Sequence, residues 1–387
     1  MNTSRASLAW WGLLPLVLLL AVAVTLTNTR LLDVLRTVPP VEELTFDRVT
    51  LSPGEIDVRV VNGGPDPVTV AQVMVDDAFW TFTISPSSTV QRLGTATIHI
   101  PYPWVEGEAH EVKLLSSTGI TFSHEIPVAV VTPKPGPFVL AVFTAIGIYV
   151  GVIPVIIGLL WLPFLRRLEE KWIHFALALT AGLLVFLGVD ALEEALETAS
   201  SLAGAYQGSL AVLLGVVATL LLLQLLSRRR SNETGAAARR AVATLVALGI
   251  GFHNLGEGLA IGAAYALGEA TLGATLIVGF MIHNTTEGLA IVAPLAKDHP
   301  RLRLLSGLGL LAGGPTVVGA WVGGFAFSPL WATLFLSVGV GAILQVLLAI
   351  YRLVAREGPD RALSPFTASG LLAGLAVMYM TGLLVAF

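Results

Sequence analysis

The sequence predicts a polytopic α-helical membrane protein, in which an eight-span bundle follows an all-β domain and an N-terminal signal anchor. Hydrophobic residues make up 55% of the 387 residues and charged residues only 12%, whereas a soluble domain carries about 25% charged residues. The net charge of -4 is small, and the basic residues are scattered over short loops, so the composition argues against a nucleic-acid partner. Because the chain has no cysteine, disulfides and thiolate metal sites are excluded, and His, Asp, Glu and Asn remain as possible metal ligands.

The first thirty residues have the composition of a targeting segment. An apolar run from Leu8 to Thr27 follows Arg5, a pattern shared by signal peptides and signal anchors. The length of the run favours an anchor over a cleaved peptide. The positive charge of Arg5 predicts that the N-terminal tip lies in the cytoplasm.

Residues 41–134 have a different composition and predict an all-β domain. Runs such as 56–61 (IDVRVV) and 96–100 (ATIHI) alternate apolar with polar residues, which is the period of half-buried strands. Pro- and Gly-rich turn signals separate the runs, so we expect a small β-sandwich of immunoglobulin-like type. Residues 133–137 (PKPGP) then form a stiff linker.

Eight apolar stretches fill the rest of the chain, residues 138–387, and each is long enough for the ~20 residues that cross a hydrocarbon core. The predicted spans are 138–161, 173–196, 210–226, 241–266, 272–295, 304–325, 330–353 and 366–387.

The distribution of Lys and Arg predicts the orientation of these spans. All odd-numbered connections between spans carry basic residues, whereas the even-numbered connections 198–208, 267–271 and 326–329 carry none. By the positive-inside rule, the odd connections are cytoplasmic. We therefore expect a multi-pass protein of the cell membrane whose β domain and C-terminus are extracellular or periplasmic.

Two nearly identical polar motifs interrupt the fourth and fifth spans, HNLGEG at residues 253–258 and HNTTEG at 283–288. Residues i and i+4 of a helix lie one above the other, so the His and Glu of each motif face the same way. Only about five residues join the two predicted spans, which must therefore be antiparallel neighbours. Two His and two Glu are a sufficient ligand set for a divalent metal. The candidate ligands are His253, Glu257, His283 and Glu287.

The cost of burying charge favours a bound cation at these motifs. An ionised side chain at the bilayer centre costs about 2.5 to 3.5 kcal/mol on insertion scales. No Lys or Arg occurs in residues 241–296, so no local salt bridge can offset the charge of the two glutamates, whereas a bound dication can. We expect this dication to be Zn²⁺, with Fe²⁺, Mn²⁺ and Cd²⁺ as alternatives. Asn254 and Asn284 either complete the coordination or hydrogen-bond a neighbouring helix.

Further acids lie at the predicted outer end of the second span. Asp190 and Glu194 are candidate entrance or accessory residues that gather cations, although a solvated helix end is an equal alternative for Glu194. The histidines of the β domain, at positions 99, 110 and 124, lack ligand spacing, and we interpret them as surface or packing residues.

The paired motifs resemble those of the ZIP family of divalent metal transporters, which have eight spans and His-Asn-x-x-(Asp/Glu)-Gly-type motifs in spans four and five. The resemblance covers residues 138–387, and Asp190 stands where many members have His. It implies movement of Zn²⁺, and often Fe²⁺ or Mn²⁺, into the cytoplasm by rocking of rigid groups of spans, and commonly a homodimer. It also implies that the motif residues are the transport-site ligands, namely His253, Asn254, Glu257, His283, Asn284 and Glu287.

Two departures from the family pattern matter. Many relatives have a Glu-Pro in span six that completes a second metal, whereas residues 313–316 here read GGPT, so a binuclear site is not supported. The cytoplasmic loop after the third span, residues 227–240, is often His-rich in the family but has no His here, so a metal-sensing loop is not supported either. The β domain is not part of the common plan, and its sequence does not indicate its partner.

The predicted transporter is not an enzyme. Two other classes of function are alternatives to it. An intramembrane metallohydrolase would need a metal-activated water and a separate general base, but the helical HExxH arrangement is missing from both motifs. A receptor or sensor would use the β domain as its working part and keep the metal site as a structural element.

Overall fold

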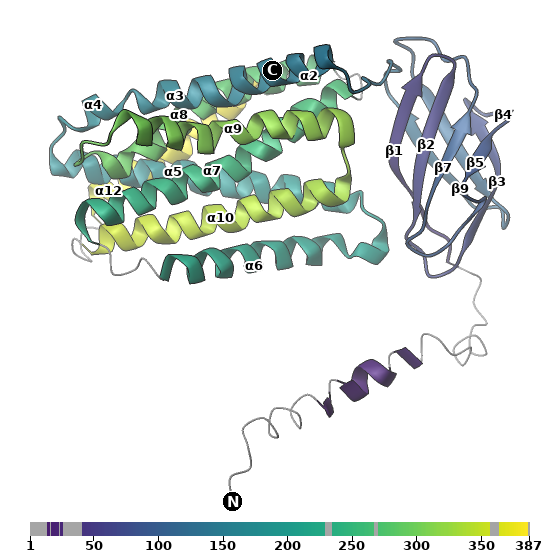
Figure 1. The fold of residues 1–387 in the computed structure, drawn as a ribbon, viewed down its shortest axis with the longest axis horizontal. Coiled ribbons are helices and arrows are strands. Elements are labelled where there is room, and N and C mark those ends of the chain that lie inside the picture. The colour runs from purple at the N-terminus through teal and green to yellow at the C-terminus, as the bar shows by residue number, and fades with distance from the viewer. Residues whose placement is uncertain are drawn as a thin grey trace, which may run out of the picture. The chain divides into compact units, whose positions relative to one another are not determined.

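The computed structural model describes residues 41–228, 234–266, 270–356 and 364–385, together with short helical stretches between residues 14 and 25. The chain divides into two compact units, Met1–Glu42 and Glu43–Phe387. The predicted signal peptide or anchor at residues 1–30 lies largely outside the described residues. All strands and all membrane-spanning helices described below belong to the second unit (Figure 1).

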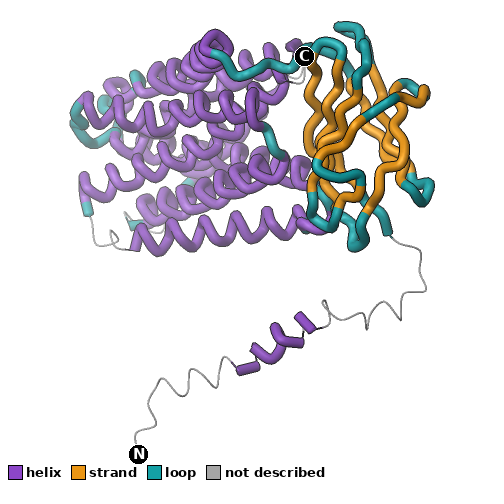
Figure 2. The backbone as a smooth tube through the Cα atoms, turned by 45° about the vertical axis from the view of Figure 1, so that its right-hand side comes forward, coloured by secondary structure: helices purple, strands orange, loops and turns teal. Residues whose placement is uncertain are grey.

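Residues 44–126 form two antiparallel sheets (Figure 2). The first has the order β1-β2-β7-β5, and the second has the order β4-β3-β8-β9, with the short β6 paired to β3. The strands are β1 (Leu44–Ser52), β2 (Glu55–Asn62), β3 (Val68–Val75), β4 (Ala78–Trp80), β5 (Thr83–Ser85), β6 (Thr89–Val90), β7 (Thr95–Ile100), β8 (His110–Ser116) and β9 (Thr121–Ile126).

The two sheets share one hydrophobic core, and strand β2 shows how its sequence produces it. Ile56, Val58 and Val60 are completely buried, whereas Asp57 and Arg59 between them point to the outer face. Side chains of both sheets, among them Ile98 of β7 and Leu114 of β8, belong to the same cluster. The alternation read from the sequence therefore correctly predicted half-buried strands in this region.

The described part of the chain contains eight helical segments that are long and apolar enough to cross a membrane, as the sequence predicted. The first segment, Pro137–Leu165, is built from several pieces: α2 (Pro137–Gly147), a π-helical turn (Ile148–Val152), α3 (Ile153–Leu159) and α4 (Leu162–Leu165). The other seven are α5 (Glu170–Ser200), α6 (Gly208–Arg228), α7 (Gly235–Ala266), α8 (Ala270–Val292), α9 (Leu302–Ala326), α10 (Pro329–Ala355) and α12 (Pro365–Val385).

Helix α7 lies at the centre of the bundle, in contact with α8, α9 and α10 (Figure 1). Its contact with α9 is close because Gly258 of α7 faces Gly319 of α9, and a Cβ at either position would collide with backbone atoms of the other helix. Gly288 of α8 meets Gly158 of α3 in the same way. Small residues at helix interfaces allow such approach in a membrane. The glycine that follows each motif glutamate is therefore a packing residue.

An ion pair shows which ends of α7 and α8 lie together. Arg239, near the start of α7, donates from Nε to Asp298 Oδ2 at 3.0 Å and from Nη2 to Oδ1 at 2.5 Å. Asp298 lies just beyond the end of α8, so the start of α7 and the end of α8 are at the same end of the bundle. The two helices are therefore antiparallel, as the short predicted connection required.

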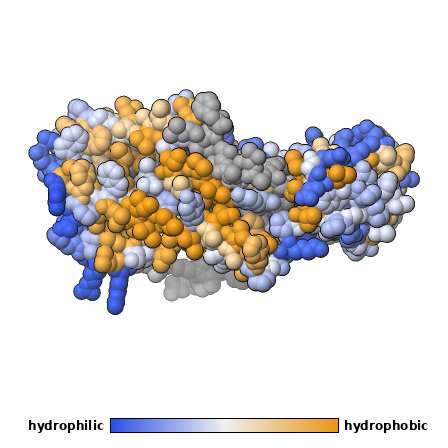
Figure 3. All heavy atoms as spheres, turned by 90° about the horizontal axis from the view of Figure 1, so that it is seen from above, coloured by the Kyte–Doolittle hydropathy of each residue, from blue (hydrophilic) through white to orange (hydrophobic). Residues whose placement is uncertain are grey.

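The outer surface of the helical region matches a membrane environment. Hydrophobic side chains cover much of the helical region on the face seen in Figure 3, and hydrophilic side chains gather at its end. Many large apolar residues of the spans are exposed, for example Leu213 and Leu222 of α6 at 56% and 57%. Exposure of this kind in eight long apolar helices identifies a multi-pass membrane protein.

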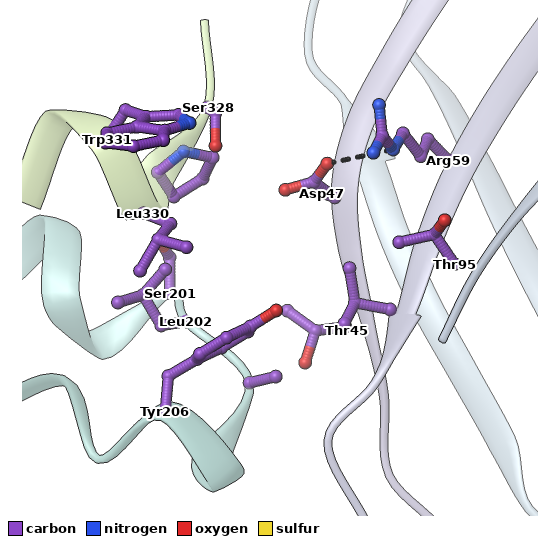
Figure 4. Close-up of a pocket in the computed structure, with 13 residues that line it drawn as sticks. Thr45, Asp47, Arg59, Thr95, Ser201, Leu202, Tyr206, Ser328, Leu330 and Trp331 are labelled. Carbon is purple, nitrogen blue, oxygen red and sulfur yellow. Dashed lines mark ion pairs between the residues drawn. The ribbon is translucent and has the colours of Figure 1, made fainter. Parts of the chain in front are cut away.

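Within the unit Glu43–Phe387, the β sheets contact one end of the helices. Arg48 of β1 donates to the carbonyl oxygen of Phe325 in α9 at 3.0 Å, and Gly204 N–H donates to Glu43 Oε1 at 2.6 Å. A cavity of about 180 Å³ lies between the outer face of β1 and β2 and the helix ends around Tyr206 and Trp331 (Figure 4).

Candidate metal site

The two polar motifs meet inside the bundle. Each lies well inside its helix, and one ligand atom from each of the four residues lies within 4.8 Å of all the others. The side chains are almost completely removed from solvent, with exposed fractions of 4% for His253, 2% for Glu257 and 14% for His283. Glu287 as a whole is 1% exposed. The structure thus brings all four candidate ligands together.

The carboxylate of Glu257 lies between the two imidazoles. His283 Nε2 contacts Glu257 Oε1, and His253 Nε2 lies 3.3 Å from the same oxygen. The two rings have centroids 6.2 Å apart. One carboxylate oxygen therefore faces two nitrogen ligands, an arrangement that a cation shared by all three groups would stabilise.

The two asparagines cross-link the motifs in a reciprocal manner. Asn254 of the first motif donates from Nδ2 to Glu287 Oε2 of the second at 3.1 Å, and Asn284 of the second donates to Glu257 Oε2 of the first at 2.9 Å. Each amide therefore orients the carboxylate that the facing helix contributes. Ligand carboxylates in metal sites are commonly held by such hydrogen bonds.

Neighbouring helices in turn hold the asparagines. Asn284 Nδ2 also donates to the Val150 carbonyl at 3.0 Å, and Asn254 Nδ2 donates to the Ala312 carbonyl of α9 at 3.2 Å. Val150 lies in the π-helical turn of the first span, four residues before Pro154. Proline has no N–H to give to the carbonyl four residues earlier, so Val150 can accept from Asn284. The spacing of the motifs did not predict this contact, although Pro154 was a signal for it in the sequence.

Several buried polar atoms at the site have no hydrogen-bond partner among the residues that the structure describes. They are His253 Nδ1 and Nε2, Asn254 Oδ1, Asn284 Oδ1 and Glu287 Oε1. Buried polar atoms in folded proteins are nearly always satisfied, and amide and carboxylate oxygens are acceptors only. The unmet oxygens, together with one of the two His253 nitrogens, therefore match the lone pairs that a metal ion takes up. Both asparagines make the hydrogen bonds to neighbouring helices that the sequence left as one alternative. Each also keeps an Oδ1 without a partner among the described residues, and metal coordination by this atom stays a prediction.

The two candidate entrance residues are placed differently. Asp190 is exposed on α5 and is not a member of the four-residue cluster. Glu194, one turn further on, is half-buried and lies within electrostatic range of His253 and Glu257. It lines a cavity of about 130 Å³ together with Gly256, which directly precedes Glu257, and Leu336 of α10. Asp190 is also within electrostatic range of His253, so what distinguishes Glu194 is its place in this cavity.

No family model matches this sequence, and no curated protein matches it. The chemistry of the site is therefore argued from its geometry and from the residues that form it.

Proposed function

We propose that this protein transports a divalent transition metal ion across the membrane, and that Zn²⁺ is its main substrate. The ion is the substrate and binds between α7 and α8, with His253, Glu257, His283 and Glu287 as ligands and with Asn254 and Asn284 assisting. The observation that carries the proposal is the convergence of two imidazoles and two carboxylates, buried and within 4.8 Å of one another, inside two membrane-spanning helices.

The donor set favours a borderline metal. Imidazole nitrogen suits Zn²⁺ and its first-row neighbours, and carboxylate oxygen adds affinity for Mn²⁺ and Fe²⁺. Zn²⁺ takes four ligands of these types in a tetrahedron. The two glutamates also supply the two negative charges that neutralise a dication in a medium where an unpaired charge is costly.

A cavity next to the site supports transport over a purely structural role. It is lined by Glu194 and reaches Gly256, one residue from a candidate ligand, so it supplies a side from which an ion could approach. The resemblance to ZIP transporters in the paired motifs supports the same function, with groups of spans rocking to expose the site to either side of the membrane. For release, an ion must be held weakly enough to leave again.

We infer the orientation from the loops and the type of the β domain from its topology. The basic odd-numbered connections place the β domain on the outer side of the membrane. Its strand orders, β1-β2-β7-β5 and β4-β3-β8-β9, correspond to the A-B-E-D and C′-C-F-G sheets of an immunoglobulin-like sandwich. This correspondence supports the immunoglobulin-like type that the sequence predicted.

Zn²⁺ flux into liposomes that contain the purified full-length protein and an enclosed zinc-sensitive dye tests the proposal. We expect Glu257→Ala/Glu287→Ala to lower the initial rate at least ~10-fold, since even residues that only hold a ligand are worth 10–100-fold in affinity. Glu193→Ala/Glu197→Ala is the matched control, because it removes two carboxylates from exposed positions of α5 and should keep most of the flux.

The outcomes separate the competing functions. Equal flux through the wild type and Glu257→Ala/Glu287→Ala rejects transport through this site. Zn²⁺ binding without flux in the wild type indicates a sensor, and zinc-dependent cleavage of a membrane substrate without flux indicates a hydrolase.

A further inference from the structure

A second group of metal-ligating side chains lies on the outer face of the β domain. Glu55 and Asp57 are two residues apart on β2, so both point to the same face of the sheet. His99 of β7 is the direct cross-strand partner of Asp57. One ligand atom from each of these three residues lies within 4.8 Å of the others. Sequence spacing did not reveal this cluster, because 42 residues separate Asp57 from His99 and only strand pairing joins them.

The imidazole of His99 is held from both sides. Its Nδ1 lies 2.6 Å from Asp57 Oδ1 and 4.0 Å from Glu55 Oε1, and its Nε2 lies 3.1 Å from the Ser85 hydroxyl on β5. A histidine that binds a metal through one nitrogen commonly makes a hydrogen bond with the other, and this bond fixes the ring. Ser85 is in position to accept such a bond and leave Nδ1 to face the two carboxylates.

The cluster is open to water, and no Lys or Arg among the described residues forms an ion pair with its two carboxylates. The side chains of Glu55, Asp57 and His99 are 47%, 29% and 36% exposed. Arg59, the next outward-facing residue on β2, pairs with Asp47 of β1 at 3.3 Å (Figure 4). The charge of Arg59 is therefore directed to the neighbouring strand, and the two carboxylates beside His99 remain available for a cation.

We propose that Glu55, Asp57 and His99 form a divalent transition metal site on the β domain, separate from the intramembrane site. One nitrogen and two carboxylate oxygens supply three protein ligands, and water completes the tetrahedron that Zn²⁺ prefers. The ligands come from two paired strands, whose register holds their Cα atoms in place. Only small side-chain rotations are needed to bring the three ligand atoms to coordination distance.

The position of this site suggests that it supplies ions to the membrane site. The same sheet face continues through Arg59 and Asp47 to the cavity at the helix ends. An exposed site with three protein ligands and water exchanges its ion readily, so it raises the local ion concentration on the side where the β domain lies. That role rests on the proposed transport function, whereas metal binding by the three residues does not.

The same hydrogen bonds also align Ser85, His99 and Asp57 in the order of a nucleophilic triad. Two observations favour the metal. Glu55 faces the same nitrogen as Asp57, a contact for which a hydrolase has no use. Ser85 is also the last residue of the short strand β5, and the next residue, Pro86, has no N–H to give to the oxyanion that forms in acyl transfer.

The test counts bound Zn²⁺ by equilibrium dialysis and elemental analysis on the full-length protein in detergent. The background is the variant Glu257→Ala/Glu287→Ala, which lacks the intramembrane carboxylates. We expect this variant to keep one Zn²⁺ per chain, and we expect the added substitution His99→Gln to remove it. His124→Gln is the matched control, since His124 belongs to the other sheet and stacks on Phe46, and it should leave the bound Zn²⁺ unchanged.

A second substitution guards against misfolding. Glu55→Gln replaces a partly exposed side chain without change of size, and we expect it to weaken the remaining site at least 10-fold. The proposal is overturned if the background variant binds no Zn²⁺, or if His99→Gln and Glu55→Gln both bind it as the background does. Labelling of Ser85 by a fluorophosphonate, together with unchanged Zn²⁺ binding in His99→Gln, would assign a hydrolase triad instead. Because flux is measured separately, failure of transport and failure of this site give different results.

Discussion

The two clusters of His and carboxylate differ mainly in what surrounds them. In the membrane, the ligands come from i and i+4 positions of two helices, and the acceptor atoms left over are shut away from water. On the β domain, they come from i and i+2 positions of one strand and from the strand beside it, and water reaches all of them. Without a metal, these side chains therefore destabilise the protein in the membrane cluster, whereas in the cluster on the β domain they have almost no effect on its stability.

The difference shows that burial, more than the type of ligand, decides how many supporting hydrogen bonds from other segments a site needs. The intramembrane glutamates need asparagine donors, which need backbone carbonyls from two further helices. The cluster of Glu55, Asp57 and His99 relies on strand register and the Ser85 hydroxyl. The four predictions below test this contrast.

The largest effect should follow from pushing α8, which carries half of the membrane site, away from α3. In Gly288→Leu the side chain would meet the backbone of Val155 and Gly158, and overpacking of this kind costs about 1–3 kcal/mol or more. We expect bound Zn²⁺ to fall from two per chain to one, and the melting temperature in detergent to fall. Gly314→Leu is the control, because nothing lies within 4 Å of a Cβ there; an equal loss in that variant would contradict the role of close packing.

The second prediction concerns stability without metal. Glu287→Gln removes a charge that is 1% exposed and should stabilise the metal-free protein by at most roughly 2.5–3.5 kcal/mol. Glu55→Gln should change stability by less than ~0.5 kcal/mol, as exposed substitutions usually do. Thermal unfolding in detergent with a chelator measures both. If Glu287→Gln were the less stable of the two, the contrast between buried and exposed carboxylates would be wrong.

The third prediction addresses the asparagines. Asn254→Ala and Asn284→Ala should each weaken Zn²⁺ binding at the membrane site about 10–100-fold, because each removes the donor that orients a ligand carboxylate. Thr285→Ala serves as the control, since the Thr285 hydroxyl donates to its own helix at Met281. Titrations in the His99→Gln background isolate the membrane site, and unchanged affinity in both asparagine variants would count against the reciprocal cross-link.

The smallest effect concerns His124, a histidine of the β domain that lies outside the cluster of Glu55, Asp57 and His99. Burial against Phe46 lowers the pKa of His124 below its usual 6.5, because the charged ring is disfavoured. The resulting stability is fully present above about pH 6.5 and is lost as the pH falls through the lower folded-state pKa. Hydrogen exchange of the β8–β9 amides in the full-length protein should therefore speed up between pH 7 and pH 5, after correction for intrinsic rates. His124→Phe should reduce that change; an undiminished response would show that another group causes it.

Local patterns predicted much of this molecule. The eight spans follow from the length of the apolar runs, and the β region follows from alternation such as that of Ile56, Val58 and Val60. The four central ligands follow from the i, i+4 spacing and the short connection between two spans. These features depend on residues close in sequence, where periodicity translates directly into geometry.

The remaining features depend on which distant segments meet. The sequence alone determined the spans, the strands and the four buried candidate ligands, because a helix or strand imposes its own spacing on neighbouring residues. Only the tertiary structure decided that Val150 accepts from Asn284, that Glu194 lines a cavity with Gly256, and that His99 pairs with Asp57. These contacts depend on how helices pack and how strands pair. A hydrogen-bond partner from a distant segment produces no periodic pattern in the sequence, so the sequence alone does not predict it.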